Sequence, residues 1–425
     1  MDYMRNELNT PLPKVYAWSC EADNPVRAEY IVMEKVAGVP LDDVWPKMDI
    51  EQRWEVTKAI AQHQQSWLTS TLPGYGSLYY TKDLHGQEII PVEGVNGRYA
   101  IGPTTGRDWS DDSRLDGAEV IAYLQAIANR EVQCINALER FPKSPVTLCG
   151  PGLFQPTRER KLQALQCYSK LLPFLAPLDR DLSKPCIWHG DLHVENIFVN
   201  PECPSEITSI IDWQATEVTP RFVQARQPHF LDYNGPKLAG LEMPRLTQNR
   251  DGLSSHEREK ARALFNNQSL VAFYRMLVKA KAPELHRCFE VQQTPAFDLL
   301  LLARNLLVDG EATYLSSVVE LAERWPEYLR ERGVKDGNVD CPVHFTEGEK
   351  AAIEKDAQAA YEGIRAMAGI QDALGDMYPE YGVVKHDDYD EVKAMLRQVK
   401  EQVLAAYAKD GDEKAAWEEA WPFQD

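Results

Sequence analysis

The chain has 425 residues, of which 44% are hydrophobic and 26% charged, with a formal net charge of −19 and a pI of about 5.0. This composition is that of a globular protein with room for two or three compact units, and its charge disfavours nucleic acid and anionic membrane faces as partners. Eight scattered cysteines without a CxxC pair argue against a zinc site or a disulfide framework, and the longest apolar run, near Leu299 to Val308, is too short to cross a bilayer.

The first quarter of the chain mixes short strands with one long helix. Pro11 and Pro13 stop a helix, and Gly38 and Pro40 form a connector. Segments rich in β-branched and aromatic residues predict strands, whereas apolar residues spaced by three or four predict a helix. In chain order we expect the last turns of a helix at 1–10, strands at 14–18 and 29–34, a helix at 50–68 and a small hairpin or irregular insertion at 73–110.

The remaining elements are predicted to be mostly helical. In the last long helix Val392, Met395, Leu396, Val399 and Val403 form one apolar stripe. The acidic residues after Lys409 are expected to fray. We expect helices at 117–140 and 155–175, a core strand at 187–188, short strands at 197–199 and 207–211, and helices at 256–281, 293–325, 346–369 and 389–408.

The central motif is HGDLHVENIFVN at 189–200, followed by IIDW at 210–213. Asp191 is the candidate base, because a carboxylate within reach of a hydroxyl can orient it and accept its proton. Asn196 lies five residues later, so a tight loop can bring its amide oxygen beside Asp191. Asp212 ends an apolar strand and supplies an anionic oxygen. Such oxygen donors suit Mg²⁺ against the phosphates of a nucleotide.

Two histidines flank the candidate base. We expect His189 to support the loop, and we expect His193 to be able to contact a transferred phosphate. The alternative for His193 is a solvated loop histidine. Trp188 and Trp213 are expected in the core. Ordinary surface or packing roles are expected for the scattered histidines His63, His85, His229 and His286.

Taken together, HGDLHxxN and IDW resemble the motifs of the aminoglycoside phosphotransferase and choline-kinase-like families, which share the bilobal protein-kinase-like fold. PLPKVYAW, AEYIVMEKVAGVPLDDVW, RYAIGP and FDLLLLARNLLVDGEATYL further resemble a large fungal branch that includes altered inheritance of mitochondria protein 9. The resemblance implies Asp191 as the base and Asn196 and Asp212 as Mg²⁺ ligands. It also implies a hinge at 33–36 whose backbone binds adenine, with Glu34 and Val36 as the best positions.

The sequence also departs from a protein kinase. Trp213 and Gln214 replace the Phe–Gly pair after the metal aspartate, and His193 stands where a lysine is usual. No Ala-Pro-Glu element follows. These differences favour a small-molecule acceptor over a protein acceptor.

A kinase also binds the nucleotide phosphates with a Gly-rich hairpin, a strand lysine and a helix glutamate. The first glycine here is Gly38, and only Lys14 and Lys35 precede it among the lysines. We therefore expect residues 1–36 to be the remnant of a smaller lobe, with apolar surface of the hinge strands exposed. Such a chain is a truncated phosphotransferase, a natural pseudoenzyme, or an enzyme that works with Mg²⁺ and a remnant cleft.

The predicted fold is α+β and mostly helical: a remnant N-lobe at 1–36, a C-lobe at 37–340 with a catalytic loop at 189–196 and a metal motif at 210–213, and a helical extension at 341–425. The predicted function is ATP-dependent phosphorylation of a small-molecule hydroxyl, with Mg²⁺ and ATP as cofactors. The alternative is a pseudokinase-type binding or regulatory protein without catalysis.

The acceptor and the location are predicted only in outline. We expect a small-molecule acceptor, no nucleic acid and no transmembrane segment. The scattered cysteines indicate reduced thiols and hence an intracellular location, and the first residues form neither a signal nor a transit peptide. The resemblance to a mitochondrial protein makes the expected location mitochondrial or cytoplasmic. By resemblance, residues 108–135 and 214–300 line the acceptor pocket. Acidic residues there can hold a cation or form a solvated face: Asp108, Asp111, Asp112, Glu217 and Asp232.

Overall fold

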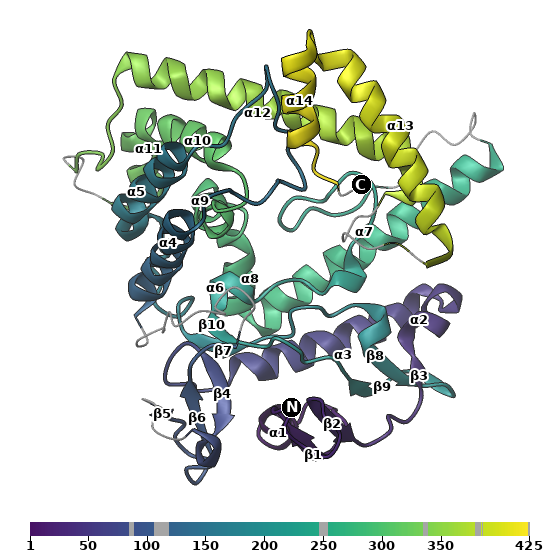
Figure 1. The fold of residues 1–425 in the computed structure, drawn as a ribbon. Coiled ribbons are helices and arrows are strands. Elements are labelled where there is room, and N and C mark those ends of the chain that lie inside the picture. Colours follow the sequence, from purple (N-terminus) through teal and green to yellow (C-terminus); the bar gives the residue numbers. More distant parts are fainter. Residues whose placement is uncertain are drawn as a thin grey trace. The chain divides into compact units, whose positions relative to one another are not determined.

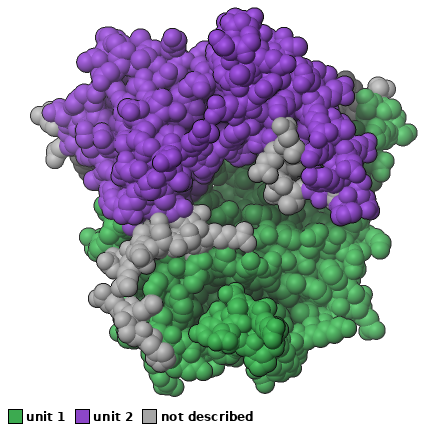
Figure 2. All heavy atoms as spheres, viewed as in Figure 1, with its two compact units in different colours: residues 1–123, 177–294 green, residues 124–176, 295–425 purple. Residues whose placement is uncertain are grey.

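The computed structural model describes residues 1–84, 89–105, 119–245, 254–334, 339–378, 384 and 386–423, without the side chain of Asp376. They divide into two compact units, one formed by residues 1–123 and 177–294 and the other by residues 124–176 and 295–425 (Figure 2). The predicted domain boundaries at residues 36 and 340 mark the lobes expected from the family resemblance. They are a different division from these two units and stay predictions.

The first unit, unit 1, combines small antiparallel sheets with helices (Figure 1). Its elements are α1 (Asp2–Asn6), β1 (Val15–Ser19), β2 (Tyr30–Met33), β3 (Val39–Pro40), α2 (Leu41–Val44), α3 (Ile50–Leu68), β4 (Ser77–Tyr80), β5 (Ile90–Pro91), β6 (Tyr99–Gly102), β7 (Pro185–Ile187), β8 (Ile197–Asn200), β9 (Cys203–Ile210), β10 (Val218–Pro220), α6 (Arg221–Gln224), α7 (Ser255–Lys281) and α8 (Pro283–Val291).

The strands of unit 1 pair into four sheets among the described residues, in the orders β1-β2, β7-β10, β3-β8-β9 and β4-β6-β5. In the β8–β9 hairpin, Ile197 lies opposite Ile210. The turn is shorter than predicted, because Pro204 and Ser205 already belong to β9. Gly38 has φ +96 and its α-carbon lies so close to β8 that a Cβ would come within 2.2 Å of the Val199 carbonyl oxygen. The connector into β3 therefore requires glycine.

Helix α3 forms the centre of the unit 1 core. Asp49 and Gln52 form a reciprocal capping box at its start, which explains why the helix begins where the sequence predicts. Its buried residues include Ile60 and Trp67, and the helix packs against β9 and α7. The Trp67 ring meets the ring of Trp188 edge-on at 5.3 Å between ring centroids. The strand that enters the HGD motif is thereby anchored to the core.

The β1–β2 sheet is the exposed part of unit 1. Apolar side chains on both strands face solvent, among them Tyr16 at 61% exposure, Ile31 at 55% and Val32 at 49%. This confirms the expectation that the strands before the hinge leave apolar surface uncovered. A two-stranded sheet is marginal by itself, and contacts with the rest of the unit, such as the 2.7 Å bond from Ile210 N to Pro11 O, hold the adjoining segment in place.

The second unit, unit 2, is helical throughout its regular structure among the described residues. It contains most of α4 (Val120–Ala137), together with α5 (Arg158–Leu175), α9 (Pro295–Leu302), α10 (Glu311–Glu323), α11 (Trp325–Glu331), α12 (Glu347–Leu374), α13 (Tyr389–Tyr407) and α14 (Gly411–Ala420).

Two predictions in unit 2 are wrong. The predicted helix at 293–325 is divided into α9 and α10: α9 ends at Leu302 and passes into a 3₁₀ turn at Ala303–Asn305, and Gly310 with φ +97 redirects the chain immediately before α10. The tail after Lys409 forms α14, capped by the Asp410 side chain. Trp417 and Trp421 of this segment are 1% and 4% exposed. Burial of these two indoles orders an acidic tail that composition alone marks as frayed.

The predicted fold class is confirmed as α+β and mostly helical. The apolar stripe of α13 packs as expected, since Val399 belongs to a buried cluster that includes Met367 and Trp417. Among the described residues, no helix combines the length and apolar character needed to cross a membrane.

Candidate active site

The HGD loop leaves β7 and returns through a short 3₁₀ turn, Val194–Asn196, into β8. The backbone of the loop is closed by two hydrogen bonds, from His193 N to Asp191 O at 3.1 Å and from Asn196 N to His193 O at 3.2 Å. The Asn196 side-chain amide adds a third bond by donating to Asp191 O at 3.0 Å. Residues 191–196 therefore form a compact loop in which Asn196 turns back toward Asp191, with the amide nitrogen rather than the predicted amide oxygen facing the Asp191 backbone.

His189 lies beneath this loop and is 2% exposed. Its Nδ1 accepts from the backbone N–H of Asp191 at 3.3 Å, so its Nε2 carries the proton and donates to Ile211 O at 2.7 Å. Its ring packs edge-on against Trp213. Burial lowers the pKa of His189, which favours the neutral ring. The arrangement matches a supporting role, because the imidazole joins the catalytic loop to the end of β9.

The Asp191 carboxylate is 60% exposed and lies between two imidazoles. Its Oδ2 is 3.4 Å from His193 Nε2, and its Oδ1 is 3.5 Å from His229 Nδ1. His229 reaches this position because its backbone N–H donates to Leu192 O at 3.0 Å. From the sequence, only an ordinary surface or packing role was expected for His229. It lies 38 positions beyond Asp191 with no spacing that links the two, so only the tertiary fold reveals the contact.

His193 has several contacts within the loop. Its Nδ1 accepts from Glu195 N at 3.3 Å and so caps the 3₁₀ turn, while its Nε2 lies 3.2 Å from Asn196 Nδ2. The ring is thereby oriented toward the carboxylate of Asp191. Its contact with a transferred phosphate stays a prediction.

Asn196 and Asp212 come from adjacent strands. Ile211 N donates to Asn196 O at 2.9 Å, which continues the β8–β9 pairing by one residue and sets Asp212 next to Asn196 along the ladder. Asp212 has φ +60, in the left-handed region that a non-glycine residue seldom adopts. Such backbone strain is concentrated at functional positions, where the surrounding structure maintains it.

The predicted hinge residues follow β2. Glu34 N donates to Lys14 O at 2.8 Å, and the Glu34 carboxylate accepts from Lys14 N at 3.1 Å and from Arg5 at 3.4 Å. The Lys14 N–H and the Arg5 guanidinium lower the pKa of Glu34. Val36 is half-buried in the connector. The hinge is thus joined to the start of β1 rather than to the HGD loop.

The remaining acidic candidates do not form a common site in the described part of the chain. Thr104 donates a hydrogen bond to Glu217, and Asp232 ends the short turn that carries His229. Within the described ranges, no group of three or more His, Cys, Asp or Glu residues could hold a metal ion. His85, Asp108, Asp111 and Asp112 lie outside the described residues.

Comparison with known proteins places these observations in a family. A subtelomeric hrmA-associated cluster protein of Aspergillus fumigatus is 24% identical over 463 residues, covering 100% of this chain and 88% of the relative. Altered inheritance of mitochondria protein 9 of Lachancea thermotolerans is 23% identical over 405 residues, covering 85% of this chain and 63% of the relative. The corresponding protein of Candida albicans is 23% identical and covers 98% of this chain and 69% of the relative.

The family model of the APH phosphotransferase enzyme family matches residues 1–223, a segment that contains the HGD loop and the IDW motif. This match confirms the resemblance inferred from the motifs. It also agrees with a protein-kinase-like fold that has a helical C-lobe. Because the match covers more than half of the 425 residues, the chain belongs to the APH phosphotransferase enzyme family.

Proposed function

We propose that this protein transfers the γ-phosphoryl group of ATP to a hydroxyl of a small molecule. The observation that carries the proposal is that three groups lie around one hairpin: the exposed Asp191 carboxylate on the loop before β8, Asn196 immediately before β8, and Asp212 two residues after the end of β9. Phosphoryl transfer depends on positioning a hydroxyl and neutralising phosphate charge, and these are the groups for that task.

Asn196 and Asp212 fit Mg²⁺. The Asn196 Nδ2 donates to Asp191 O, so the amide oxygen is the group left to face a cation. One amide oxygen and one carboxylate make a two-ligand site, which suits an ion that usually binds through one or two protein oxygens together with substrate phosphates and water. Bound Mg²⁺ would supply positive charge to the nucleotide phosphates.

Asp191 is proposed as the base. The acceptor hydroxyl donates its proton to Asp191 as its oxygen bonds to the γ-phosphorus and the bond to the leaving oxygen of ADP breaks. His193 and His229, on either side, hold the carboxylate in one orientation. His189 acts below them as a positioning residue through its bonds to Asp191 N and Ile211 O.

The adenine is proposed to bind at the hinge. The N–H of Glu34 already donates to Lys14 O. Its carbonyl therefore remains to accept from an adenine amino group, and Val36 N–H is the proposed donor to the ring. The relatives labelled mitochondrial support the proposal that this protein also acts in mitochondria. Imaging of the tagged protein together with a mitochondrial marker tests this location.

The metal assignment is tested by calorimetric titration of ATP into the full chain with and without Mg²⁺. Asp212→Asn should weaken Mg²⁺-dependent ATP binding by about tenfold or more, since a contact to a charged group is worth roughly 1.5–3 kcal/mol. The control is Asp23→Asn, which removes an exposed carboxylate of the same unit from the turn between β1 and β2. Equal affinity for the two variants would contradict the assignment.

A further inference from the structure

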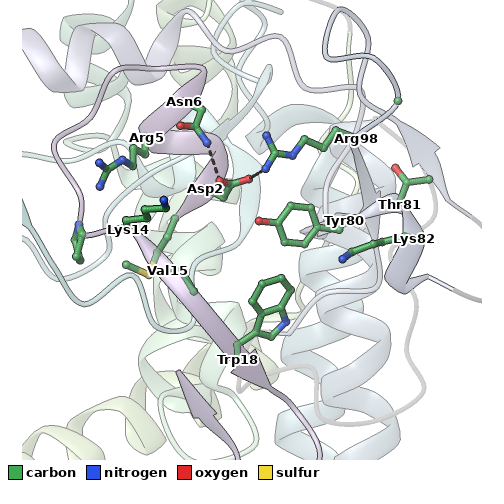
Figure 3. A pocket seen from close by; sticks show the side chains of 13 residues that line it. Asp2, Arg5, Asn6, Lys14, Val15, Trp18, Tyr80, Thr81, Lys82 and Arg98 are labelled. Atoms are coloured by element: carbon green, nitrogen blue, oxygen red, sulfur yellow. Dashed lines mark hydrogen bonds and ion pairs between the residues drawn. The ribbon is translucent and has the colours of Figure 1, made fainter. Parts of the chain in front are cut away.

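Unit 1 contains a cavity of about 840 Å³ whose lining includes none of the HGD-loop residues, Asn196 or Asp212. Its walls come from α1, from β1 and the residues before it, from the end of β4 with the 3₁₀ turn that follows, and from the two residues before β6. Figure 3 shows side chains from these elements facing a common space. The inference drawn from this cavity is independent of the proposed phosphotransferase function.

Four cationic side chains line the cavity, and two of them are already paired. Arg98 lies 2.6 Å from the Asp2 carboxylate, which also accepts from Tyr99 Oη at 2.7 Å. Arg5 lies 3.4 Å from Glu34. Both carboxylates that face or adjoin the cavity are thus paired with an arginine, and the attraction of Glu34 extends in part to Lys14.

The other two cations are Lys14 and Lys82. Among the described residues neither lies within 4 Å of a carboxylate oxygen. Lys82 Nζ lies instead 5.7 Å from the ring centre of Trp18 and 5.5 Å from that of Tyr80. In Figure 3 the two lysines approach the space from opposite sides. The cavity is therefore locally positive on a chain whose net charge is −19, which favours an anionic ligand here.

Aromatic rings form the floor of the cavity. Trp18 stacks on Tyr80 at 5.4 Å between ring centroids, and Tyr80 stacks on Tyr99 at 5.6 Å, each pair with planes 23° apart. Trp18 ends this stack and is 44% exposed. A second cavity of about 770 Å³ also includes Trp18 and Tyr80 in its lining and continues to Ile31. An apolar or aromatic group has a surface to pack against beside the charged groups.

One polar group on the lining has no partner. The hydroxyl oxygen of Thr81 is buried and makes no hydrogen bond within the described part of the chain. A buried hydroxyl without a partner is costly, but this oxygen is not accessible from the cavity, so it offers no contact to a ligand in the present side-chain arrangement.

We propose that this cavity binds a small molecule that carries a phosphate monoester and an aromatic or apolar group. Lys14 and Lys82 hold the phosphate, and Trp18 packs against the apolar part. Two lysines suit a phosphate group that carries nearly two negative charges at neutral pH. The stacked rings beside them favour a phosphate ester with an aromatic or apolar group over a free phosphate ion.

The test uses isothermal titration of phenyl phosphate and of inorganic phosphate into the full chain, with EDTA present so that no metal bridges phosphate to the candidate active site. Wild type should bind phenyl phosphate more tightly than inorganic phosphate. Lys14→Gln and Lys82→Gln should each weaken phenyl phosphate by about tenfold, because each removes one charge-assisted contact. Trp18→Ala should abolish the preference for phenyl phosphate while retaining phosphate binding.

The matched control is Lys260→Gln, which removes an exposed lysine of α7 in the same unit and should leave both affinities unchanged. All substituted side chains are at least partly exposed, and circular dichroism confirms that each variant folds. Equal phenyl phosphate affinity in wild type and in both lysine variants would overturn the proposal. So would equal affinity of wild type for the two probes.

Discussion

The buried ion pair of unit 2 provides a quantitative test of the packing. Lys161 on α5 and Glu311 at the start of α10 are both 0% exposed, with Nζ 2.9 Å from Oε2. Lys161 also donates to Leu306 O at 2.8 Å. Burial raises the pKa of Glu311 despite its cationic partner. Desolvation therefore outweighs the attraction, and the pair stabilises the unit mainly by preventing an isolated buried charge.

Lys161→Met removes the partner and leaves Glu311 in an apolar site. At pH 7 the carboxyl must be protonated for the unit to fold, and its ordinary pKa is 4.5. Neutralising it across roughly 2.5 pH units costs about 3.4 kcal/mol, close to the ~3–5 kcal/mol typical of a broken buried pair. Because the pKa of Glu311 is higher in the folded state than in the unfolded state, the folded variant has its full stability below pH 4.5 and loses stability as the pH rises above it. The loss should therefore shrink by about 1.4 kcal/mol for each pH unit on acidification.

Hydrogen exchange of peptides from α5 and α10 measures this loss directly, since a chain with two units need not unfold in one transition. Lys161→Met with Glu311→Gln should recover most of the stability, because the charge is gone. Lys350→Met, which removes a surface pair with Glu323, should cost at most about 1 kcal/mol. A Lys161→Met loss below about 1 kcal/mol at pH 7, or one independent of pH, would refute the reasoning.

Three further outcomes are expected. His229→Asn should lower kcat about tenfold and leave KM for ATP unchanged. This loss is smaller than the ~10²–10⁴-fold loss expected when a catalytic base is removed. Steady-state kinetics equal to those of wild type would contradict the positioning role of His229. Gly38→Ala should destabilise unit 1 by about 1–3 kcal/mol in urea titrations, because its Cβ would clash with Val199 O. Burial lowers the pKa of His189, so the free energy of unfolding of wild type should fall as the pH drops below 6.5. In urea titrations at several pH values, His189→Asn should show a smaller fall over the same range. An equal fall in both proteins would contradict the buried, neutral state of His189.

Local signals predicted much of the fold. The helix at Ile50–Leu68 was predicted with its observed bounds, because its cap and its apolar spacing are both encoded within the segment. The split between α9 and α10 was not predicted, since the apolar spacing continues across residues where the chain leaves the helix after Leu302 and re-enters it after the left-handed Gly310. The order of α14 depends on burial of Trp417 in a cluster of distant residues. Tertiary burial therefore overrides composition there.

The candidate site shows the same division. Asp191 and Asn196 lie on one short loop, so their spacing alone brings them together. Asp212 joins them through the β8–β9 pairing, which the two apolar strand segments indicate. His229 could not be predicted, because its approach to Asp191 depends on a backbone bond to Leu192 that connects separate segments. The two lysines of the 840 Å³ cavity, Lys14 and Lys82, are likewise contributed by distant segments.

The central claim is that Asp191 serves as the base of a phosphotransferase. The most direct measurement incubates the full chain and its Asp191→Asn variant with γ-³²P-ATP, Mg²⁺ and a small-molecule extract, and separates labelled products from ATP and free phosphate. Wild type should form a labelled phosphate ester, and Asp191→Asn should form it at least about 10²-fold more slowly while binding Mg²⁺–ATP normally. Equal rates for the two proteins would contradict the role of Asp191, and ATP binding without any transfer by wild type would contradict catalysis.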